Sequence, residues 1–177
     1  MSEAKSVAVI GLGSMGYGMA QSCLRAGHTT YGIDVAPEPM ARFQSEGGAA
    51  GTLADVAPSL DAALVVVLNA AQTEAVLFGE DGVVPLMAEG SVVLACATVP
   101  PDFARSMEAR CAAHGVHYLD APISGGAAKA AQGALSIMAS GTAAAFATAR
   151  PVLDAISETV FELGDAAGAG SAMKAVN

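Results

Sequence analysis

Short apolar runs rich in β-branched residues alternate along this chain with stretches in which apolar residues recur every three or four positions. The first run, residues 6–10 (SVAVI), is apolar on both faces, which is typical of a buried strand in a parallel sheet. The next stretch, residues 15–26, has Met15, Met19 and Cys23 at helical spacing, and Gly27 ends this predicted helix. The alternation therefore predicts a parallel α/β sheet.

The same alternation continues over the following ninety or so positions. Five further strands are predicted, at residues 29–33, 49–51, 63–68, 91–97 and 116–119. Helices are predicted between them, at residues 37–45, 53–60, 73–78 and 102–114. Six strands with intervening helices complete a Rossmann-like, doubly wound and mostly parallel sheet with helices on both faces.

The pattern changes after the sixth strand. We expect a loop, a strand, a helix that Pro151 interrupts, and another strand, at residues 120–126, 135–140, 142–156 and 159–163. A glycine-rich stretch follows, and a new helix begins near Ala172 shortly before the chain ends. Residues 1–163 are therefore expected to form one domain, and residues 164–177 to start a connecting helix that is cut short.

The charge balance of the 177 residues narrows the range of partners. With 17 acidic and 8 basic side chains the net charge is −9, which argues against a nucleic-acid partner. Apolar residues make up 53% of the chain, enough for a sizeable core.

The longest uncharged run, residues 130–149, has membrane-spanning length, but polar residues divide its apolar positions into two clusters. We therefore expect a strand followed by a helix there, and no membrane span.

The cysteines and histidines do not indicate a metal site. Three cysteines, Cys23, Cys96 and Cys111, lie in apolar segments, which favours buried, reduced thiols in a cytoplasmic protein. The polar start of the chain does not resemble a secretory signal peptide. The three histidines lack metal-ligand spacing and are expected at the surface or as caps: His28, His114 and His117.

A glycine motif follows the first predicted strand and opens the first predicted helix. Gly11, Gly13 and Gly16 form G-x-G-x-x-G, which is weak alone but is here in the setting that dinucleotide binding requires. The first glycine permits a tight turn, the second lets the backbone approach a pyrophosphate, and the third allows close helix–strand packing. The start of the helix supplies amide donors for the phosphates. Two alternatives are a turn needed only for packing and a methyltransferase-type loop for another adenosine ligand.

An acidic residue ends the second predicted strand. Asp34 follows Gly11 by 23 positions, where a carboxylate accepts hydrogen bonds from ribose hydroxyls and repels the 2′-phosphate of NADP. No arginine or lysine occurs in residues 35–41. The sequence therefore predicts NAD as the cofactor, in preference to NADP.

Four segments together resemble the β-hydroxyacid dehydrogenase family, which includes relatives of 3-hydroxyisobutyrate dehydrogenase and tartronate semialdehyde reductase. They are GLGSMGYGMA at 11–20, ATVPP at 97–101, DAPISGG at 120–126 and GDAAGAGSAMKAVN at 164–177. Residues 69–79 and 120–141 look most similar to the L-threonate dehydrogenase branch, which acts on four-carbon sugar acids. The resemblance implies that an all-helical domain, absent here, follows the cofactor domain and completes both the substrate site and a homo-oligomer.

The resemblance implies that Lys174 is the catalytic acid/base. Oxidation of an alcohol removes a hydride from carbon and a proton from oxygen, so a base must lie beside the hydroxyl. A free lysine is protonated at neutral pH, and a dry pocket beside a positively charged nicotinamide would favour the neutral amine. From the residues alone, a solvated side chain on a helix face is the favoured interpretation of Lys174.

The same resemblance assigns the substrate carboxylate to a loop of small residues, Ser124, Gly125 and Gly126, whose hydroxyl and amides can converge on an anion. From the residues alone, an ordinary turn is the favoured interpretation. Nearby Lys129 is expected to be a solvated charge. Asn177 is a further substrate candidate, although family members often use the following position instead.

Other candidates line the expected cofactor crevice at the carboxyl ends of the strands. Thr98 ends the fifth predicted strand, where the family usually has Ser-Thr and this chain has Ala97-Thr98. Leu68 and Asn69 end the fourth. The full set of expected cofactor residues is Gly11, Leu12, Gly13, Met15, Gly16, Asp34, Leu68, Asn69 and Thr98.

These features together predict an NAD-dependent dehydrogenase of a short hydroxy acid, with four carbons the expected substrate size. 3-Hydroxyisobutyrate dehydrogenase and tartronate semialdehyde reductase activities are alternatives. A nucleotide-binding sensor without turnover is an alternative of another class, although it needs neither Lys174 nor the 120–126 loop. The fragment itself is expected to be inactive, because its substrate pocket lacks a second wall.

Overall fold

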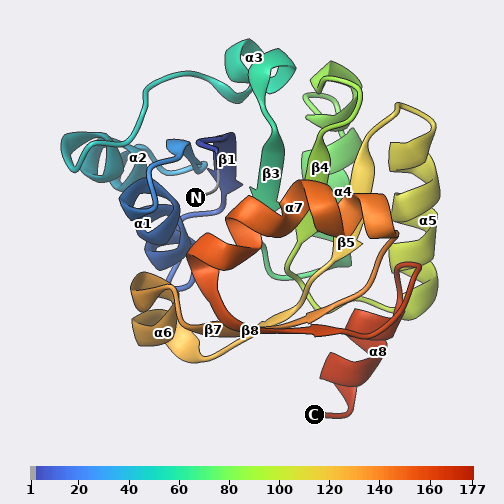
Figure 1. The fold of residues 1–177 in the computed structure, drawn as a ribbon. Coiled ribbons are helices and arrows are strands. Elements are labelled where there is room, and N and C mark those ends of the chain that lie inside the picture. The colour runs from blue at the N-terminus through green and yellow to red at the C-terminus, as the bar shows by residue number, and fades with distance from the viewer. Residues whose placement is uncertain (1–2) are drawn as a thin grey trace.

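The computed structural model describes residues 3–177, and its centre is a parallel five-stranded sheet (Figure 1). The strand order is β2-β1-β3-β4-β5. Successive strands are added outward on one side of β1 and then on the other, which is the doubly wound arrangement. The strands are β1 (Ser6–Ile10), β2 (Thr29–Ile33), β3 (Ala62–Val65), β4 (Val92–Ala95) and β5 (His117–Asp120).

Alternate residues of the buried strands enter two separate cores, one on each face of the sheet. Val7 and Val9 belong to one core, and Ala8 and Ile10 belong to the other. The helices that connect these strands are α1 (Gly16–Arg25), α2 (Pro37–Ser45), α3 (Leu53–Val56), α4 (Ala70–Phe78) and α5 (Pro101–Ala112). Two short 3-10 turns, Ala57–Ser59 and Val84–Leu86, complete the connections. The Rossmann-like fold predicted from the sequence is therefore confirmed.

A second, three-stranded sheet extends the first and has the order β6-β7-β8. Strand β6 is antiparallel to β7, and β7 is parallel to β8. A single antiparallel bridge between Asp120 and Ser140 joins the end of β5 to the end of β7. The remaining elements are β6 (Ile123–Ser124), α6 (Gly126–Gln132), β7 (Leu135–Ala139), α7 (Ala143–Ile156), β8 (Ser157–Glu162) and α8 (Ala169–Ala175).

Several boundaries differ from the sequence prediction. The short strand predicted at 49–51 is wrong, because only one bridge forms there, between Tyr31 and Ala49. The strand predicted to reach residue 68 ends at Val65. Pro151 does not interrupt α7, whose buried residues continue on both sides of the proline and hold the helix in place. Helix α6 was not predicted, since its small residues show no amphipathic pattern and its packing is against distant α1.

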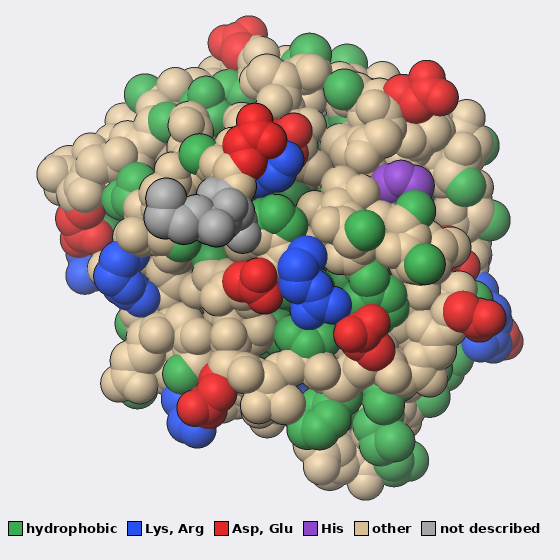
Figure 2. Space-filling model, in the orientation of Figure 1, with side chains coloured by type: hydrophobic (Ala, Val, Ile, Leu, Met, Phe, Trp, Pro, Cys, Tyr) green, Lys and Arg blue, Asp and Glu red, His purple; other side chains and the backbone are tan. Residues whose placement is uncertain are grey.

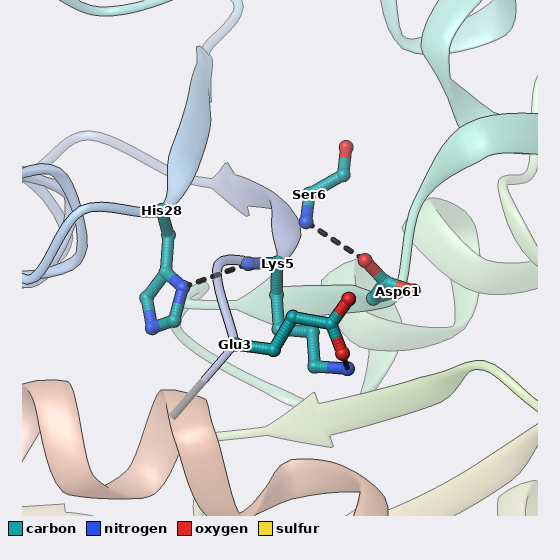
Figure 3. A network of polar contacts seen from close by, with 5 residues as sticks. All are labelled: Glu3, Lys5, Ser6, His28 and Asp61. Atoms are coloured by element: carbon teal, nitrogen blue, oxygen red, sulfur yellow. Dashed lines mark hydrogen bonds and ion pairs between the residues drawn. The ribbon is translucent and has the colours of Figure 1, made fainter. Parts of the chain in front are cut away.

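A buried histidine ties the start of the chain to the core (Figure 3). The backbone N–H of Lys5 donates to Nδ1 of His28 at 3.0 Å, and Nε2 of His28 lies 3.2 Å from the carbonyl oxygen of Pro151. Because Nδ1 accepts, we assign the ring hydrogen to Nε2. The backbone N–H of Ser6 donates to Asp61 nearby, at 2.9 Å. His28 is therefore neither a surface nor a capping residue, whereas His114 is exposed and His117 is half-buried.

The three cysteines are buried and unpaired, as predicted. Burial raises the pKa of each thiol to about 12, so the reactive thiolate is scarce at pH 8. We expect the folded protein to show no rapid reaction with a thiol-specific dye, and all three cysteines to react in denaturant. A spectrophotometric thiol count made before and after unfolding tests this. A fast-reacting thiol in the native protein would contradict the burial.

Candidate functional site

The glycine turn between β1 and α1 is tightly packed at two positions and open at the third. Gly11 has φ +103°, and a Cβ added to it would lie 2.1 Å from the carbonyl oxygen of Val66. A Cβ on Gly16 would lie 1.8 Å from the carbonyl oxygen of Gly11. A Cβ on Gly13 would meet no atom within 4 Å. The backbone at Gly13 is therefore open to a ligand, as a pyrophosphate site requires.

The carboxylate of Asp34 lies against this turn. Its Oδ2 accepts a hydrogen bond from the backbone N–H of Leu12 at 2.7 Å, and its Oδ1 accepts one from Ala36 at 2.9 Å. The side chain of Leu12 is buried in the core, so Leu12 offers this region only its backbone. Asp34 remains partly exposed, and each oxygen retains capacity to accept from a ribose hydroxyl.

The nearest basic residue that follows Asp34 in the chain contacts a glutamate and a tyrosine ring. Arg42, on α2, places Nε 3.4 Å from Oε2 of Glu46 and its guanidinium 4.5 Å from the centre of the Tyr17 ring. Arg42 thus contacts Tyr17 of α1 and Glu46 just after α2, while its side chain stays 67% exposed and lines a cavity with Gly13 and Ser14 of the glycine turn.

A crevice of about 290 Å³ opens where the glycine turn meets the carboxyl ends of β3 and β4. It brings together five of the predicted cofactor residues: Gly13, Met15, Gly16, Leu68 and Thr98. Cys96 and Ile123 also line it, and neither was predicted from the sequence to be a cofactor residue. Ile123 immediately precedes Ser124, so the crevice reaches the start of the 124–126 loop. Its position is the one at which doubly wound sheets bind their ligands.

Asn69 has a different role from its neighbour Leu68. Its Oδ1 accepts from the backbone N–H of Gln72 at 2.9 Å, which makes Asn69 the N-cap of α4. Asn69 does not line the crevice, whereas Leu68 does and is 85% exposed. Asn69 is itself exposed, and its contact with the cofactor stays a prediction.

Ser124 and Asn177 line a second cavity of about 460 Å³, although they are far apart in the sequence. Ser124 pairs with Ser136 across β6 and β7, and Asn177 follows the end of α8. Gly125 and Gly126 have φ +139° and +80°, so the turn after Ser124 needs glycine. Both glycines are exposed, and neither lines the cavity.

The surface around this cavity is strongly apolar. Figure 2 shows apolar side chains gathered at the bottom of the molecule, where Figure 1 places α8 and the C-terminus. Phe161, Met173 and Val176 are 50%, 46% and 82% exposed, and Phe161 and Met173 line the cavity. Large exposed apolar side chains that gather in one region mark a contact surface.

Lys174 is half-buried on α8 and lines neither cavity. Within residues 3–177, no carboxylate lies within ion-pair distance of its Nζ. Lys129 is exposed on α6 and likewise has no ion pair among these residues. Lys174 therefore lies on the helix whose Met173 lines the Ser124–Asn177 cavity, but it is not itself one of the residues that line this cavity.

A buried carboxylate that was not selected from the sequence is bonded to the start of the helix that carries Lys174. Asp120, the first residue of the DAPISGG segment, is fully buried at the end of β5. Its partners are on the loop before α8 and on α8 itself. An aspartate at a strand end was the available signal, but nothing local indicates partners some fifty positions away.

Comparison with known proteins defines the family. Residues 6–164 match the sequence family described as the NAD binding domain of 6-phosphogluconate dehydrogenase, and this chain belongs to that family. An L-threonate dehydrogenase from Cupriavidus necator is 48% identical over 174 residues, which is 98% of this chain and 59% of that protein. The chain spans less than two thirds of the length of this relative.

Solved structures agree with the fold. A crystal structure of 3-hydroxyisobutyrate dehydrogenase from Salmonella typhimurium superposes with a TM-score of 0.93 at 46% identity, covering 97% of this chain and 60% of that one. A 3-hydroxyisobutyrate dehydrogenase from Mycobacterium tuberculosis, described with L-serine, gives 0.90 at 28% identity, covering 99% of this chain and 59% of that one. The predicted NAD-binding domain and the resemblance to β-hydroxyacid dehydrogenases are both confirmed.

Two further findings bear on the site. No helix within residues 3–177 combines the length and apolar character needed to cross a membrane. The same residues contain no group of three or more histidine, cysteine or acidic side chains arranged to hold a metal ion.

Proposed function

We propose that this chain is the cofactor-binding part of an NAD-dependent dehydrogenase acting on a short hydroxy acid, with a four-carbon acid such as L-threonate as the favoured substrate. The observation that carries the proposal is the crevice in which the open backbone at Gly13 meets the ends of β3 and β4, with Asp34 bonded to the same turn. The name of the 48% identical relative supports the substrate class.

The cofactor residues divide into three groups. The turn at residues 11–16 holds the pyrophosphate, and Asp34 receives the ribose hydroxyls and disfavours a 2′-phosphate. Leu68, Thr98 and Met15 border the nicotinamide side of the crevice. When bound, the nicotinamide supplies the site that accepts or returns a hydride.

The substrate residues occupy the adjoining region. Ser124 and the amides of Gly125 and Gly126 bind the carboxylate, Asn177 contributes from across the cavity, and Lys174 exchanges the hydroxyl proton. Residues 1–163 hold the cofactor, and residues 164–177 lead into the part that completes the substrate site. The greater length of the relatives and the exposed apolar surface beside the cavity support this division. We further propose a homo-oligomer and a cytoplasmic location, where buried thiols stay reduced.

A second substrate has support of its own. The 46% identical Salmonella structure is described as a 3-hydroxyisobutyrate dehydrogenase, so 3-hydroxyisobutyrate is the main competitor for L-threonate. Turnover assays on the longest natural form of this protein, with a panel of three-, four- and branched four-carbon hydroxy acids, decide between them. The proposal requires the highest kcat/KM for a straight four-carbon acid.

Calorimetric titration with NADH and NADPH tests the cofactor assignment. We expect NADH to bind at least about tenfold more tightly, a difference of about 1.4 kcal/mol. Asp34→Asn should reduce that preference, because it removes the charge that repels the 2′-phosphate. The ratio of the two affinities is the informative quantity, since loss of the bonds to Leu12 and Ala36 weakens the site for both cofactors.

Asp55→Asn is the matched control, since it removes one exposed carboxylate on α3 and should leave the ratio unchanged. Equal affinity for NADH and NADPH in the unsubstituted protein would refute the role of Asp34. Failure to bind either cofactor would refute the proposed site.

A further inference from the structure

Asp120 makes three well-formed hydrogen bonds, all to the start of α8. Its Oδ2 accepts from the backbone N–H groups of Gly168 at 3.1 Å and Ser171 at 2.8 Å. Its Oδ1 accepts from the hydroxyl of Ser171 at 2.7 Å. Gly168 is the N-cap of α8 and has no capping side chain of its own. The carboxylate of Asp120, supplied from β5, therefore takes the place of a local cap.

Ser140, which follows β7 of the second sheet, also bonds to both Asp120 and the first turn of α8. Its backbone exchanges two hydrogen bonds with Asp120, of 3.0 and 2.9 Å, and its Oγ accepts from the backbone N–H of Gly170 at 2.9 Å. A Cβ on Gly170 would lie 2.3 Å from the carbonyl oxygen of Met138 and 2.9 Å from that of Asp120. The first turn of α8 therefore rests directly on the ends of β5 and β7.

The position of Asp120 in the chain connects two parts of the proposed site. Four residues after Asp120 comes Ser124, at the start of the loop assigned to the substrate carboxylate. Three residues after Ser171 comes Lys174, on the helix that Asp120 caps. The buried side chain of Asp120 is thus bonded to α8, which carries Lys174. Asp120 also belongs to the same chain segment as the Ser124–Gly126 loop.

We propose that Asp120 is a positioning residue, whose ionised carboxylate fixes α8, and with it Lys174, relative to the Ser124–Gly126 loop. The role of Lys174 in this statement rests on the proposed function, but the attachment of α8 does not. An anion is favoured at a helix N-terminus by both the free N–H groups and the helix dipole. Burial raises the pKa of the Asp120 carboxyl, and hydrogen bonds from Ser171 and Gly168 oppose that rise.

Amide hydrogen exchange, followed by NMR, tests the attachment. In Asp120→Ala we expect exchange at Gly168, Gly170 and Ser171, and along α8, to become about tenfold faster or more, because the first turn loses its acceptor. Asp120→Asn keeps the shape and one acceptor oxygen, so it should recover part of the protection. Ser171→Ala keeps the charge and loses only the hydroxyl, and it serves as the test if Asp120→Ala fails to fold.

Thr30→Val is the control for a general loss of stability. Thr30 is fully buried on β2, at the far edge of the sheet, and its hydroxyl donates to the carbonyl oxygen of His28 at 3.0 Å. This variant should leave exchange in α8 unchanged relative to the rest of the chain. In the longest natural form, Asp120→Asn should lower kcat while the KM for NADH stays constant.

The inference is overturned if exchange in α8 rises no more than elsewhere in Asp120→Asn and Ser171→Ala. It is also overturned if kcat and the KM for NADH change together, as they would if the whole domain loosened. Exchange in α8 is measured without cofactor or substrate. A failed cofactor titration would therefore refute the proposed function and leave this test intact.

Discussion

Replacing Lys174 by methionine in the longest natural form of the protein is expected to lower kcat by about 10²- to 10⁴-fold, the usual contribution of a positioned acid or base. Methionine preserves much of the length and apolar stem of lysine and removes the amine. NADH affinity should be unchanged, because Lys174 lies on α8 and outside the crevice of the glycine turn. Initial rates and calorimetric titration measure the two quantities separately.

Lys129→Met is the matched control for Lys174. Lys129 is also a helical lysine near the proposed substrate loop, but it is exposed and is assigned no role. Its replacement should change kcat by less than about twofold, in line with the small effects of most surface substitutions. Turnover that survives in Lys174→Met and disappears in Lys129→Met would move the acid/base role to the other lysine.

Alanine at Gly16 and alanine at Gly13 are expected to damage the protein in different ways. At Gly16 the new methyl would lie 1.8 Å from the carbonyl oxygen of Gly11, so backbone must move. We expect a loss of about 3 kcal/mol or more in the free energy of unfolding, at the upper end of overpacking effects. Urea denaturation measures the loss.

At Gly13 the same methyl meets no protein atom within 4 Å, and the free energy of unfolding should change by about 0.5 kcal/mol or less. The methyl would stand where the backbone must approach the pyrophosphate, so NADH affinity should fall about tenfold or more. A Gly13→Ala protein that binds NADH normally would show that the turn serves packing alone.

Much of the main sheet could be predicted from the sequence because its signals are local. The apolar strands, the helical spacing of Met15, Met19 and Cys23, and the glycines of the turn all lie within short windows. In a doubly wound sheet the end of the second strand lies next to the turn that follows the first strand. Asp34, just after the second strand, is accordingly bonded to Leu12 of that turn. Residues 49–51 (AAG) were overpredicted, because their place in the alternation of strands and helices does not show whether a partner strand runs alongside, and only one bridge forms there.

The region around the proposed substrate site was harder to predict, since it is built from contacts between distant segments. Helix α6 has no apolar stripe of its own, and its C-terminal carbonyls are bonded by Ser22 and Arg25 of α1. Pro151 was expected to break α7, but the packed residues on both sides outweigh the hydrogen bond that proline cannot make. Tertiary packing overrides local propensity in both cases.

The sequence alone therefore predicted the class of fold, the dinucleotide turn and the acidic residue beside it, whereas the candidate substrate segments were proposed from a family resemblance. Periodicity and turn chemistry are properties of neighbouring residues, so they can be read without a structure. Only the tertiary structure decided that Ser124 and Asn177 share a cavity, that Asn69 caps a helix, and that Asp120 holds the start of α8. These relations join residues that only the folded chain brings together, and a buried carboxylate acquires its role from the donors that surround it.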